Sequence, residues 1–281
     1  MFFVDVNVKS ISPKPKMIRK KTIISLKNVT VARDNSKILS GINWQVMQGQ
    51  CCAVIGPNGA GKSALIAVIS GYLWPQDGFV SVFGNTYGEV DLQTIRSKIG
   101  LIEPSRTPRF DDTMLVKEVI ATGLFGTLML PIDRSVTKQQ WKKVDSQISF
   151  FKLNKQKNLP INALSTGEQT KVLIARAMIS KPKMLILDEP TNGLDMANRA
   201  IVVNILNKMR KHKNPPAIII VSHHLEELPQ SLDNILLLKS GKIVSQGQPQ
   251  KVLTSLNLSK TFGCKVKVLK HKGAYLASAR I

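Results

Sequence analysis

Cysteine is scarce in this chain of 281 residues, which holds only Cys51, Cys52 and Cys264. Their spacing fits neither a zinc site nor a disulfide framework, so we expect a reducing compartment. Long apolar runs are missing as well, because the segment 124–131 is short and contains a glycine. The start does not form a secretory signal, since Asp5 interrupts it and basic residues follow. These absences predict a cytoplasmic protein that does not itself cross a bilayer.

Acidic residues are also few, because 18 Asp and Glu stand against 40 Lys and Arg, for a formal net charge of +22. No acidic residue follows Asp233, and the segment 9–21 is basic and contains prolines. Such a charge favours anionic partners, which include nucleic acid, anionic lipid and polyphosphates. No nucleic-acid-binding motif accompanies it, so a solvated basic surface is an equal alternative. Charge alone does not select the partner.

A glycine-rich segment follows the apolar run 52–55 and precedes a helix-forming run that starts near Lys62. This order is typical of phosphate binding, because glycines let backbone N–H groups approach a polyphosphate and the helix adds its positive end. We expect Lys62 to reach the outer phosphates and the hydroxyl of Ser63 to hold Mg²⁺. A plain turn of small residues is the alternative. The predicted phosphate-binding residues are Gly56, Pro57, Asn58, Gly59, Ala60, Gly61, Lys62 and Ser63.

Two further apolar runs lead to polar side chains. Residues 184–187 end at Asp188 and Glu189, and residues 218–221 are followed by His223 after one serine. Ligands gather at the carboxyl ends of parallel strands. Adjacent carboxylates point different ways from a strand, so one can hold a metal ion while the other takes a proton from water. His223 is a further site candidate, with a solvated, helix-capping histidine as the alternative.

Two capping boxes predict helix starts, one at Thr137 with Gln140 and one at Ser165 with Glu168. The first helix carries an apolar stripe at intervals of three and four, which we interpret as a core-facing surface. The start of the second helix, with Gly167 in its first turn, is a second place for an anion. An ordinary helix N-cap is the default explanation of that start.

The chain divides into three predicted parts. Residues 1–21 form a flexible basic arm, residues 22–247 form one domain, and residues 248–281 form an extension with a β-hairpin. The segment of about 104–180 is an α-helical subdomain inserted in that domain.

Alternating apolar residues predict an antiparallel β layer from 22–32, 38–47 and the hairpin 77–87, followed by a short strand at 99–102. The apolar patch 128–130 is expected to pack in the core, with partner docking as the alternative.

The motifs together resemble the ATP-binding subunit of ABC transporters over about residues 22–247. The five matching elements are the Walker A loop at 56–63, the signature at 164–169, the Walker B strand at 184–189, the D-loop at 192–195 and the switch histidine His223. The resemblance implies an α/β fold, with a P-loop NTPase (RecA-like) core, an antiparallel β layer and an inserted α-helical subdomain.

The resemblance also implies a homodimer, in which ATP lies between the Walker loop of one protomer and the signature of the other. Ser165 and Gly167 then contribute to the ATP site, and Asp195 couples the two halves. The implied partners are membrane permease subunits, which would place the chain peripherally on the inner face of the cell membrane.

The implied reaction is ATP hydrolysis with Mg²⁺. By resemblance Asp188 coordinates the ion through water, and Glu189 activates the attacking water. His223 contacts the γ-phosphate and, with Glu189 and Lys62, completes the catalytic set.

Two positions depart from the family's pattern. Near the turn at 33–36 the family usually has an aromatic residue that stacks on adenine, where this chain offers Arg33. A guanidinium can stack on a base, and a solvated turn residue is the equal alternative. The glutamine that the family uses to meet Mg²⁺ and to relay to the membrane partner is replaced by Glu103, followed by Pro104 and Ser105. Glu103 would bring an extra negative charge toward the metal.

A soluble ABC ATPase that acts on nucleic acid or ribosomes is the alternative function, suggested by the basic tail and the missing glutamine. Members of that translation-associated class normally carry two ATP-binding domains in one chain, so nucleic acid is the less favoured partner. A nucleotide-binding scaffold without turnover is disfavoured because Glu189 and His223 are both present. Within the family, two features resemble the molybdenum-type or a related soluble-subunit branch: Thr166 and Glu168 in the signature, and the run Ser222, His223, His224 and Glu226.

Overall fold

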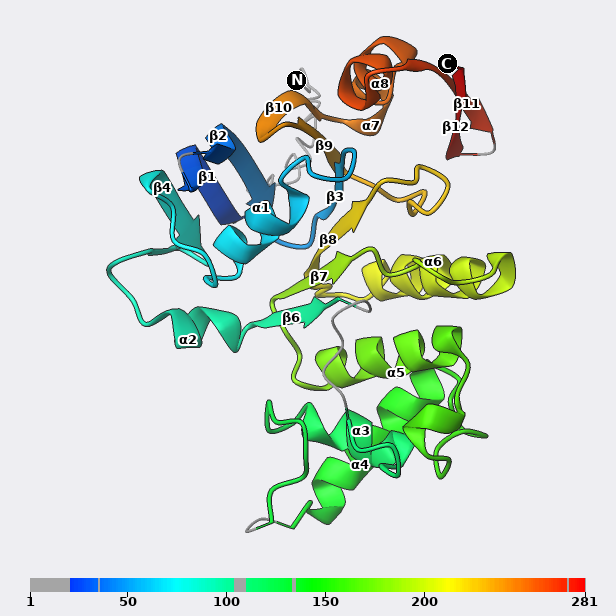
Figure 1. Ribbon diagram of the computed structural model, residues 1–281. Coiled ribbons are helices and arrows are strands. Elements are labelled where there is room, and N and C mark those ends of the chain that lie inside the picture. Colours follow the sequence, from blue (N-terminus) through cyan, green and yellow to red (C-terminus); the bar gives the residue numbers. More distant parts are fainter. Residues whose placement is uncertain (1–20, 35, 104–109, 133–134, 272, 281) are drawn as a thin grey trace, which may run out of the picture.

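The computed structural model describes residues 21–34, 36–103, 110–132, 135–271 and 273–280. The predicted arm 1–21 therefore lies outside the described residues apart from Lys21, and so do Pro104 and Ser105. Figure 1 shows the β layer with α1 on one side of the central sheet and the larger helices below it.

The centre of the fold is a six-stranded sheet in the order β10-β9-β3-β8-β7-β6. Its strands are β3 (Cys51–Ile55), β6 (Ile99–Ile102), β7 (Met184–Asp188), β8 (Ala217–Ser222), β9 (Asn234–Lys239) and β10 (Lys242–Gly247). All neighbours pair in parallel except β10, which pairs antiparallel with β9 at one edge. β3 is buried over its whole length, which is why it is an uninterrupted apolar run. This order brings the carboxyl ends of β3, β7 and β8 to one edge.

A four-stranded antiparallel sheet in the order β2-β1-β4-β5 covers one side of this centre. Its strands are β1 (Thr22–Arg33), β2 (Ser36–Met47), β4 (Asp77–Val82) and β5 (Asn85–Thr86), which confirms the predicted antiparallel layer. Helix α1 (Lys62–Ile69) shares one apolar core with both sheets through Leu65 and Ile69.

The next helices are α2 (Leu92–Arg96), α3 (Val116–Thr122), α4 (Lys138–Phe150), the 3₁₀ turn η2 (Ile161–Ala163), α5 (Thr166–Ile179) and α6 (Met196–Arg210). Both predicted capping boxes form, because the hydroxyl of Thr137 accepts the backbone N–H of Gln140 and that of Ser165 accepts the N–H of Glu168. In return, the side-chain oxygens of Gln140 and Glu168 accept the backbone N–H of Thr137 and of Ser165, so α4 and α5 start where the sequence predicts.

The burial of two apolar segments, in α4 and at 128–130, tests the predictions that they pack in the core. Val144 and Ile148 of α4 are buried, which confirms the core-facing stripe. Leu128 and Met129 are 42% and 60% exposed, so the expectation that the patch 128–130 packs in the core is wrong for these two side chains. Only Leu130 of that patch packs against the core.

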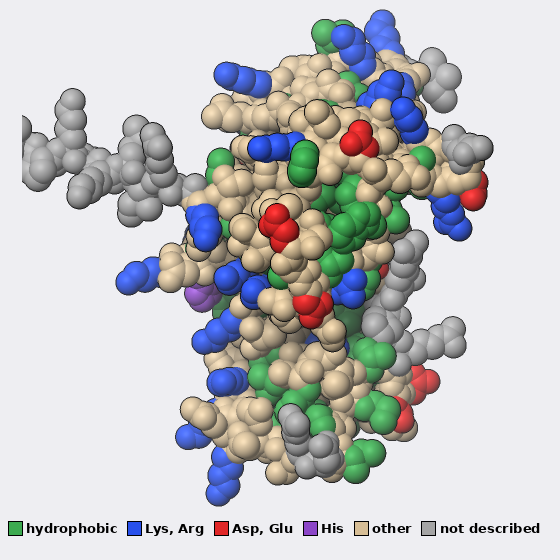
Figure 2. Space-filling view, turned by 90° about the vertical axis from the view of Figure 1, so that its left-hand side faces the viewer, with side chains coloured by type: hydrophobic (Ala, Val, Ile, Leu, Met, Phe, Trp, Pro, Cys, Tyr) green, Lys and Arg blue, Asp and Glu red, His purple; other side chains and the backbone are tan. Residues whose placement is uncertain are grey.

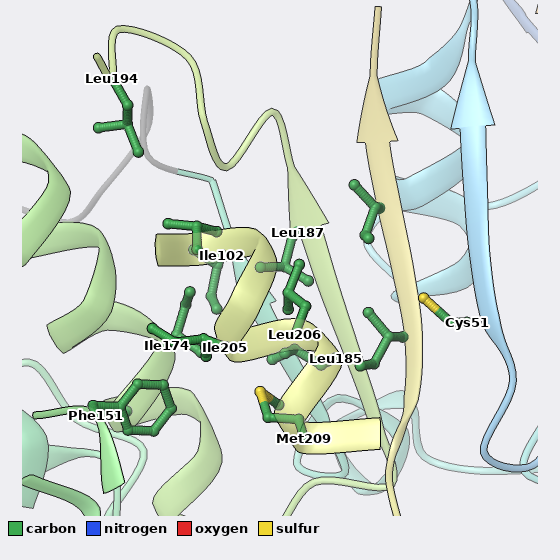
Figure 3. Close-up of a cluster of buried hydrophobic side chains, with 14 of the residues drawn as sticks. Cys51, Ile102, Phe151, Ile174, Leu185, Leu187, Leu194, Ile205, Leu206 and Met209 are labelled. Atoms are coloured by element: carbon green, nitrogen blue, oxygen red, sulfur yellow. The ribbon is translucent and has the colours of Figure 1, made fainter. Parts of the chain in front are cut away.

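Alternate side chains of the central strands enter two different cores. Cys52 and Val54 of β3 face α1 and the antiparallel sheet, whereas Cys51 and Ile55 face the opposite core. Successive side chains of a strand point to opposite faces, so one short strand anchors both layers. Figure 3 shows part of the second core, where side chains of β6, β7, α5 and α6 meet beside Cys51.

The chain ends with α7 (Pro249–Val252), α8 (Ser255–Phe262), β11 (Lys265–His271) and β12 (Ala274–Arg280). β11 and β12 pair antiparallel, with Leu269 opposite Leu276. On the face drawn in Figure 2, Lys and Arg side chains are spread over the upper, middle and lower parts rather than gathered in one patch. Within the described ranges, every helix is too short or too polar to span a membrane.

Candidate functional site

The glycine-rich loop connects the carboxyl end of β3 to the start of α1. A Cβ on Gly56 would lie 2.2 Å from the carbonyl oxygen of Leu238, so only glycine fits beneath β9. Gly61 precedes the helix with a φ of 99°, a left-handed conformation that favours glycine. Among the described residues, the N-cap Gly61 supplies no side-chain hydrogen bond to the first N–H groups of α1. The start of α1 is thus available to an anionic group.

Lys62 folds back over the loop that precedes it. Its side chain is 8% exposed, and Nζ donates to the carbonyl oxygens of Gly56 at 2.7 Å and Pro57 at 3.2 Å. Burial lowers the pKa of Lys62, while the negative charges of Glu189 and Asp188 oppose that shift. Nζ lies 3.9 Å from Oε1 of Glu189, so the ammonium sits between loop and carboxylates.

Glu189 occupies a strained position directly after β7. Its φ is 49°, which costs a non-glycine residue about 1–3 kcal/mol. The backbone N–H of Glu189 donates to the carbonyl oxygen of Val221 at 2.9 Å, and its Oε1 lies 3.0 Å from Nδ1 of His223. Asn192 adds a donor 3.5 Å from Oε2. These contacts hold the carboxylate at the sheet edge despite the backbone strain.

A cleft of about 380 Å³ opens at this edge. It is lined by Ile38, Asn58, Gly59, Ala60, Gly61, Lys62, Ser63, Ala64, Glu103, Asp188 and Glu189. The structure thus brings residues 58–63 of the predicted loop and the carboxylates of Asp188 and Glu189 to one cavity. Ile38 was predicted only as a strand residue, and no local signal in β2 places it here.

The lining of this cleft does not include seven other predicted site residues: Gly56, Pro57, His223, Ser165, Gly167, Asp195 and Arg33. Ser165 and Gly167 lie at the start of α5, and Asp195 is the N-cap of α6. Arg33 has a side chain 80% exposed, with Nε 3.6 Å from Oδ2 of Asp34. A Cβ on Gly167 would lie 2.3 Å from Cγ of Asn198, so the starts of α5 and α6 pack closely together.

The donor set of the cleft fits Mg²⁺. Three carboxylates, those of Glu103, Asp188 and Glu189, share the lining with one ammonium, that of Lys62. A polyphosphate in this lining would therefore meet an excess of negative charge, which a divalent cation offsets. The hydroxyl of Ser63 and the carboxylate of Asp188 are the hard oxygen donors that Mg²⁺ prefers, and Mg²⁺ usually takes its other ligands from phosphate and water.

The sequence profile of the family described as "ABC transporter" matches residues 39–192. A putative ABC transporter ATP-binding protein of Streptococcus mutans serotype c is 30% identical over 247 residues, which cover 88% of this chain and 94% of that protein. The energy-coupling factor transporter ATP-binding protein EcfA2 of Clostridium perfringens is 31% identical over 222 residues, 78% of this chain and 75% of that protein.

Solved structures agree with the fold. The structure of cbiO1 from Clostridium perfringens, described as part of the ABC transporter complex cbiONQ, matches with a TM-score of 0.73 and 27% identity over 86% of this chain and 94% of that one. The ATP-binding cassette MJ0796, dimeric and bound to ADP and Pi after hydrolysis, matches with a TM-score of 0.68 over 80% of this chain and 98% of that one. At 23% identity, MJ0796 supports the fold alone.

The chain belongs to the ABC transporter family, as one of its ATP-binding, ATP-hydrolysing subunits. The predicted P-loop NTPase fold class is confirmed. None of the relatives named above is described as acting on nucleic acid or ribosomes, and none as molybdenum-type, so the branch assignment stays a prediction.

Proposed function

We propose that two copies of this chain close on ATP and that hydrolysis drives a separate membrane permease. The observation that carries the proposal is the distribution of the predicted site residues within one protomer. The phosphate loop and the β7 carboxylates line the cleft, whereas Ser165 and Asp195 lie outside it. A second copy facing the cleft would add the Ser165 hydroxyl and the N-terminal end of α5. The proposal takes the dimeric MJ0796 cassette as an analogy only, since that protein shares the fold at 23% identity.

Different residues of the chain bind the phosphates and accept the proton of the attacking water. The loop N–H groups and Lys62 hold the β- and γ-phosphates, and Glu189 accepts the proton of the attacking water. The water oxygen bonds to the γ-phosphorus as the bond to the β–γ bridging oxygen breaks, which releases ADP and phosphate. Because an ionised carboxylate only accepts hydrogen bonds, Nδ1 of His223 carries the proton in its contact with Glu189. Nε2 can donate to the γ-phosphate only when both ring nitrogens carry a proton.

The proposed cofactor is Mg²⁺, which would be held by Ser63 and Asp188. When bound, the ion neutralises charge on the β- and γ-phosphates. Glu103 contributes a carboxylate to the same cleft. We propose that Arg33, which extends from the end of β1 into solvent, meets the adenine only after ATP has entered.

The proposed partners are the membrane subunits of a transporter. The printed descriptions of cbiO1 and of the energy-coupling factor protein place those relatives in transporter complexes. By analogy we propose that this chain lies in the cytoplasm, against the inner face of the cell membrane. Co-purification from detergent-solubilised membranes of the source cell tests the analogy, and recovery without any membrane protein contradicts it.

Mixing two inactive variants tests the shared ATP site. Lys62→Ala removes the phosphate contact, and Ser165→Arg blocks the start of α5. In a mixed dimer, the intact loop of one protomer faces the intact signature of the other, so one of the two sites is restored. If protomers pair at random, an equimolar mixture should recover about a quarter of the wild-type ATPase rate.

The alternative is a complete site within each protomer. In that case the mixture stays as inactive as either variant, and the proposed dimer is wrong. Thermal unfolding of Ser165→Arg is the control, because loss of the N-cap alone costs about 1 kcal/mol. A matched mixture of Lys62→Ala with wild type reports the rate expected from dilution.

A further inference from the structure

A buried carboxylate lies four residues beyond His223. The side chain of Glu227 is only 4% exposed, and Leu225 and Leu228 beside it are buried in the core. Its two oxygens contact different elements, since Oε2 accepts the hydroxyl of Ser222 at 3.0 Å and Oε1 lies 3.5 Å from Nη1 of Arg199. Glu227 therefore joins the end of β8 to the start of α6.

The contact to Ser222 fixes the turn that carries His223. Ser222 is the last residue of β8 and is 1% exposed. Its Oγ accepts the backbone N–H of His224 at 2.9 Å while it donates to Glu227. The residues on both sides of His223 are thus held through one hydroxyl, which orients the imidazole toward Glu189.

The contact to Arg199 fixes the segment that carries Asp195. Nε of Arg199 donates to the carbonyl oxygen of Leu194 at 2.8 Å. Leu194 is 4% exposed and directly precedes Asp195, whose Oδ1 accepts the backbone N–H of Asn198 at 2.7 Å. One guanidinium therefore connects the start of α6 with the same carboxylate that holds Ser222.

Stability is a weak explanation for this arrangement. Oε1 of Glu227 is buried and accepts no hydrogen bond from the part of the chain that the structure describes, so its ion pair with Arg199 offsets only part of the cost of desolvation. Replacing a buried ion pair by apolar side chains is often neutral or stabilising, and Leu225 and Leu228 beside Glu227 are already buried. The carboxylate does, however, set the relative position of two segments that come from different strand ends.

We propose that Glu227 is a positioning residue, which couples the His223 turn to the Asp195 segment through Ser222 and Arg199. The inference rests on the proposed function, because it concerns how that site responds to the second protomer. When the partner protomer contacts Asp195, the displacement reaches His223 through the side chains of Arg199, Glu227 and Ser222. Glu227 touches neither ATP nor the attacking water in this scheme.

The test uses three variants of the full chain. Glu227→Gln keeps the shape and can still accept from Ser222, but it loses the charge that attracts Arg199. Arg199→Lys keeps the positive charge, but a lysine ammonium cannot replace both the Nη1 contact to Glu227 and the Nε hydrogen bond to the Leu194 carbonyl oxygen. This variant also covers the case in which Glu227→Gln fails to fold. Glu226→Gln is the matched control, because that neighbouring carboxylate is 46% exposed and contacts only His224 among the described residues.

We expect Glu227→Gln and Arg199→Lys to lower kcat for ATP hydrolysis about tenfold, with KM for ATP within about twofold. The double variant should lose no more than the worse single variant, because both changes break one connection. Glu226→Gln should keep the wild-type kcat. Additive losses, or a wild-type kcat in both single variants, overturn the proposal.

Hydrogen exchange provides a readout that does not depend on activity. In Glu227→Gln, backbone exchange should rise in residues 222–228 and also in residues 192–198, on the far side of the connection. A rise confined to 222–228 means a local structural role and overturns the proposal. If the wild-type chain forms no ATP-dependent dimer, the proposed function fails, while the exchange experiment still decides whether the two segments are coupled.

Discussion

Nδ1 of His223 lies 3.0 Å from Oε1 of Glu189, although 34 positions separate the two residues in the chain. They meet because β7 and β8 are parallel neighbours, with Asp188 paired to Val221. The backbone N–H of Glu189 also donates to the carbonyl oxygen of Val221, so the ends of β7 and β8 hold the carboxylate and the histidine at a fixed separation.

This contact gives the first prediction. Glu189→Gln removes the base but leaves the phosphate loop and Lys62 intact, so hydrolysis should fall by about 10² to 10⁴ while ATP still binds. Phosphate release and the binding of a fluorescent ATP analogue measure the two effects separately. Glu89→Gln, an exposed carboxylate on the antiparallel sheet side, is the control. Unchanged turnover in Glu189→Gln would remove Glu189 as the base.

Glu103 gives a prediction about charge in the cleft. It lines the same cavity as Asp188 and Glu189, so its carboxylate repels the triphosphate when no metal is present. Glu103→Gln should therefore tighten ATP binding in the presence of EDTA, by about 1 kcal/mol or roughly fivefold. Calorimetric titration at low ionic strength measures this change, with Glu89→Gln as the remote control. Weaker metal-free binding would show that Glu103 does not act through its charge.

Gly167 gives a prediction about packing between α5 and α6. Its added Cβ would lie 2.3 Å from Cγ and 2.7 Å from Cβ of Asn198, so Gly167→Ala must push the two helix starts apart. Overpacking of this kind costs about 1–3 kcal/mol, and we expect Tm to fall by about 5 °C. Differential scanning calorimetry measures the shift. The neighbouring Thr166 is exposed, and Thr166→Ala should keep Tm nearly unchanged.

The cysteines give a prediction about reactivity. Cys51 and Cys52 are fully buried in β3, and desolvation raises both thiol pKa values, that of Cys51 to about 12. Thiolate is the reactive form, so a thiol reagent at pH 8 should label only Cys264 in the native protein. After unfolding in guanidinium, all three should react. Rapid native labelling of two or more thiols would contradict the buried position of β3.

The same thiols predict the direction of alkaline destabilisation. Above the ordinary pKa of 9.0, the unfolded chain loses the Cys51 proton, whereas the folded chain keeps it until about pH 12. The unfolded state then binds fewer protons, so the free energy of unfolding falls as pH rises through this window. Urea unfolding at pH 8, 9 and 10 measures the slope. Cys51→Ala should reduce the slope, while Cys52 keeps its own contribution, and an equal slope in both proteins would count against this origin.

Much of the fold could be predicted from the sequence, because its signals are local. The capping boxes at Thr137 and Ser165 and the apolar run of β3 each depend on neighbouring residues, and all three appear as predicted. Helix α6 was not predicted, although Val202 and Ile205 begin an apolar series at helical spacing that is buried in the structure. Helices α7 and α8 were also not predicted, and their short length gives weak periodicity.

The sequence alone determined the phosphate loop, the carboxylates after β7 and the order of the motifs, since each depends on residues adjacent in the chain. Tertiary structure decided which of these residues meet. Parallel strand order joined Glu189 to His223, and core packing brought Ile38 and Glu103 to the cleft while it left Ser165 outside. Glu227 and Arg199 meet for the same reason. Contacts between distant segments arise from the burial of whole sheet faces, which no short window of sequence contains.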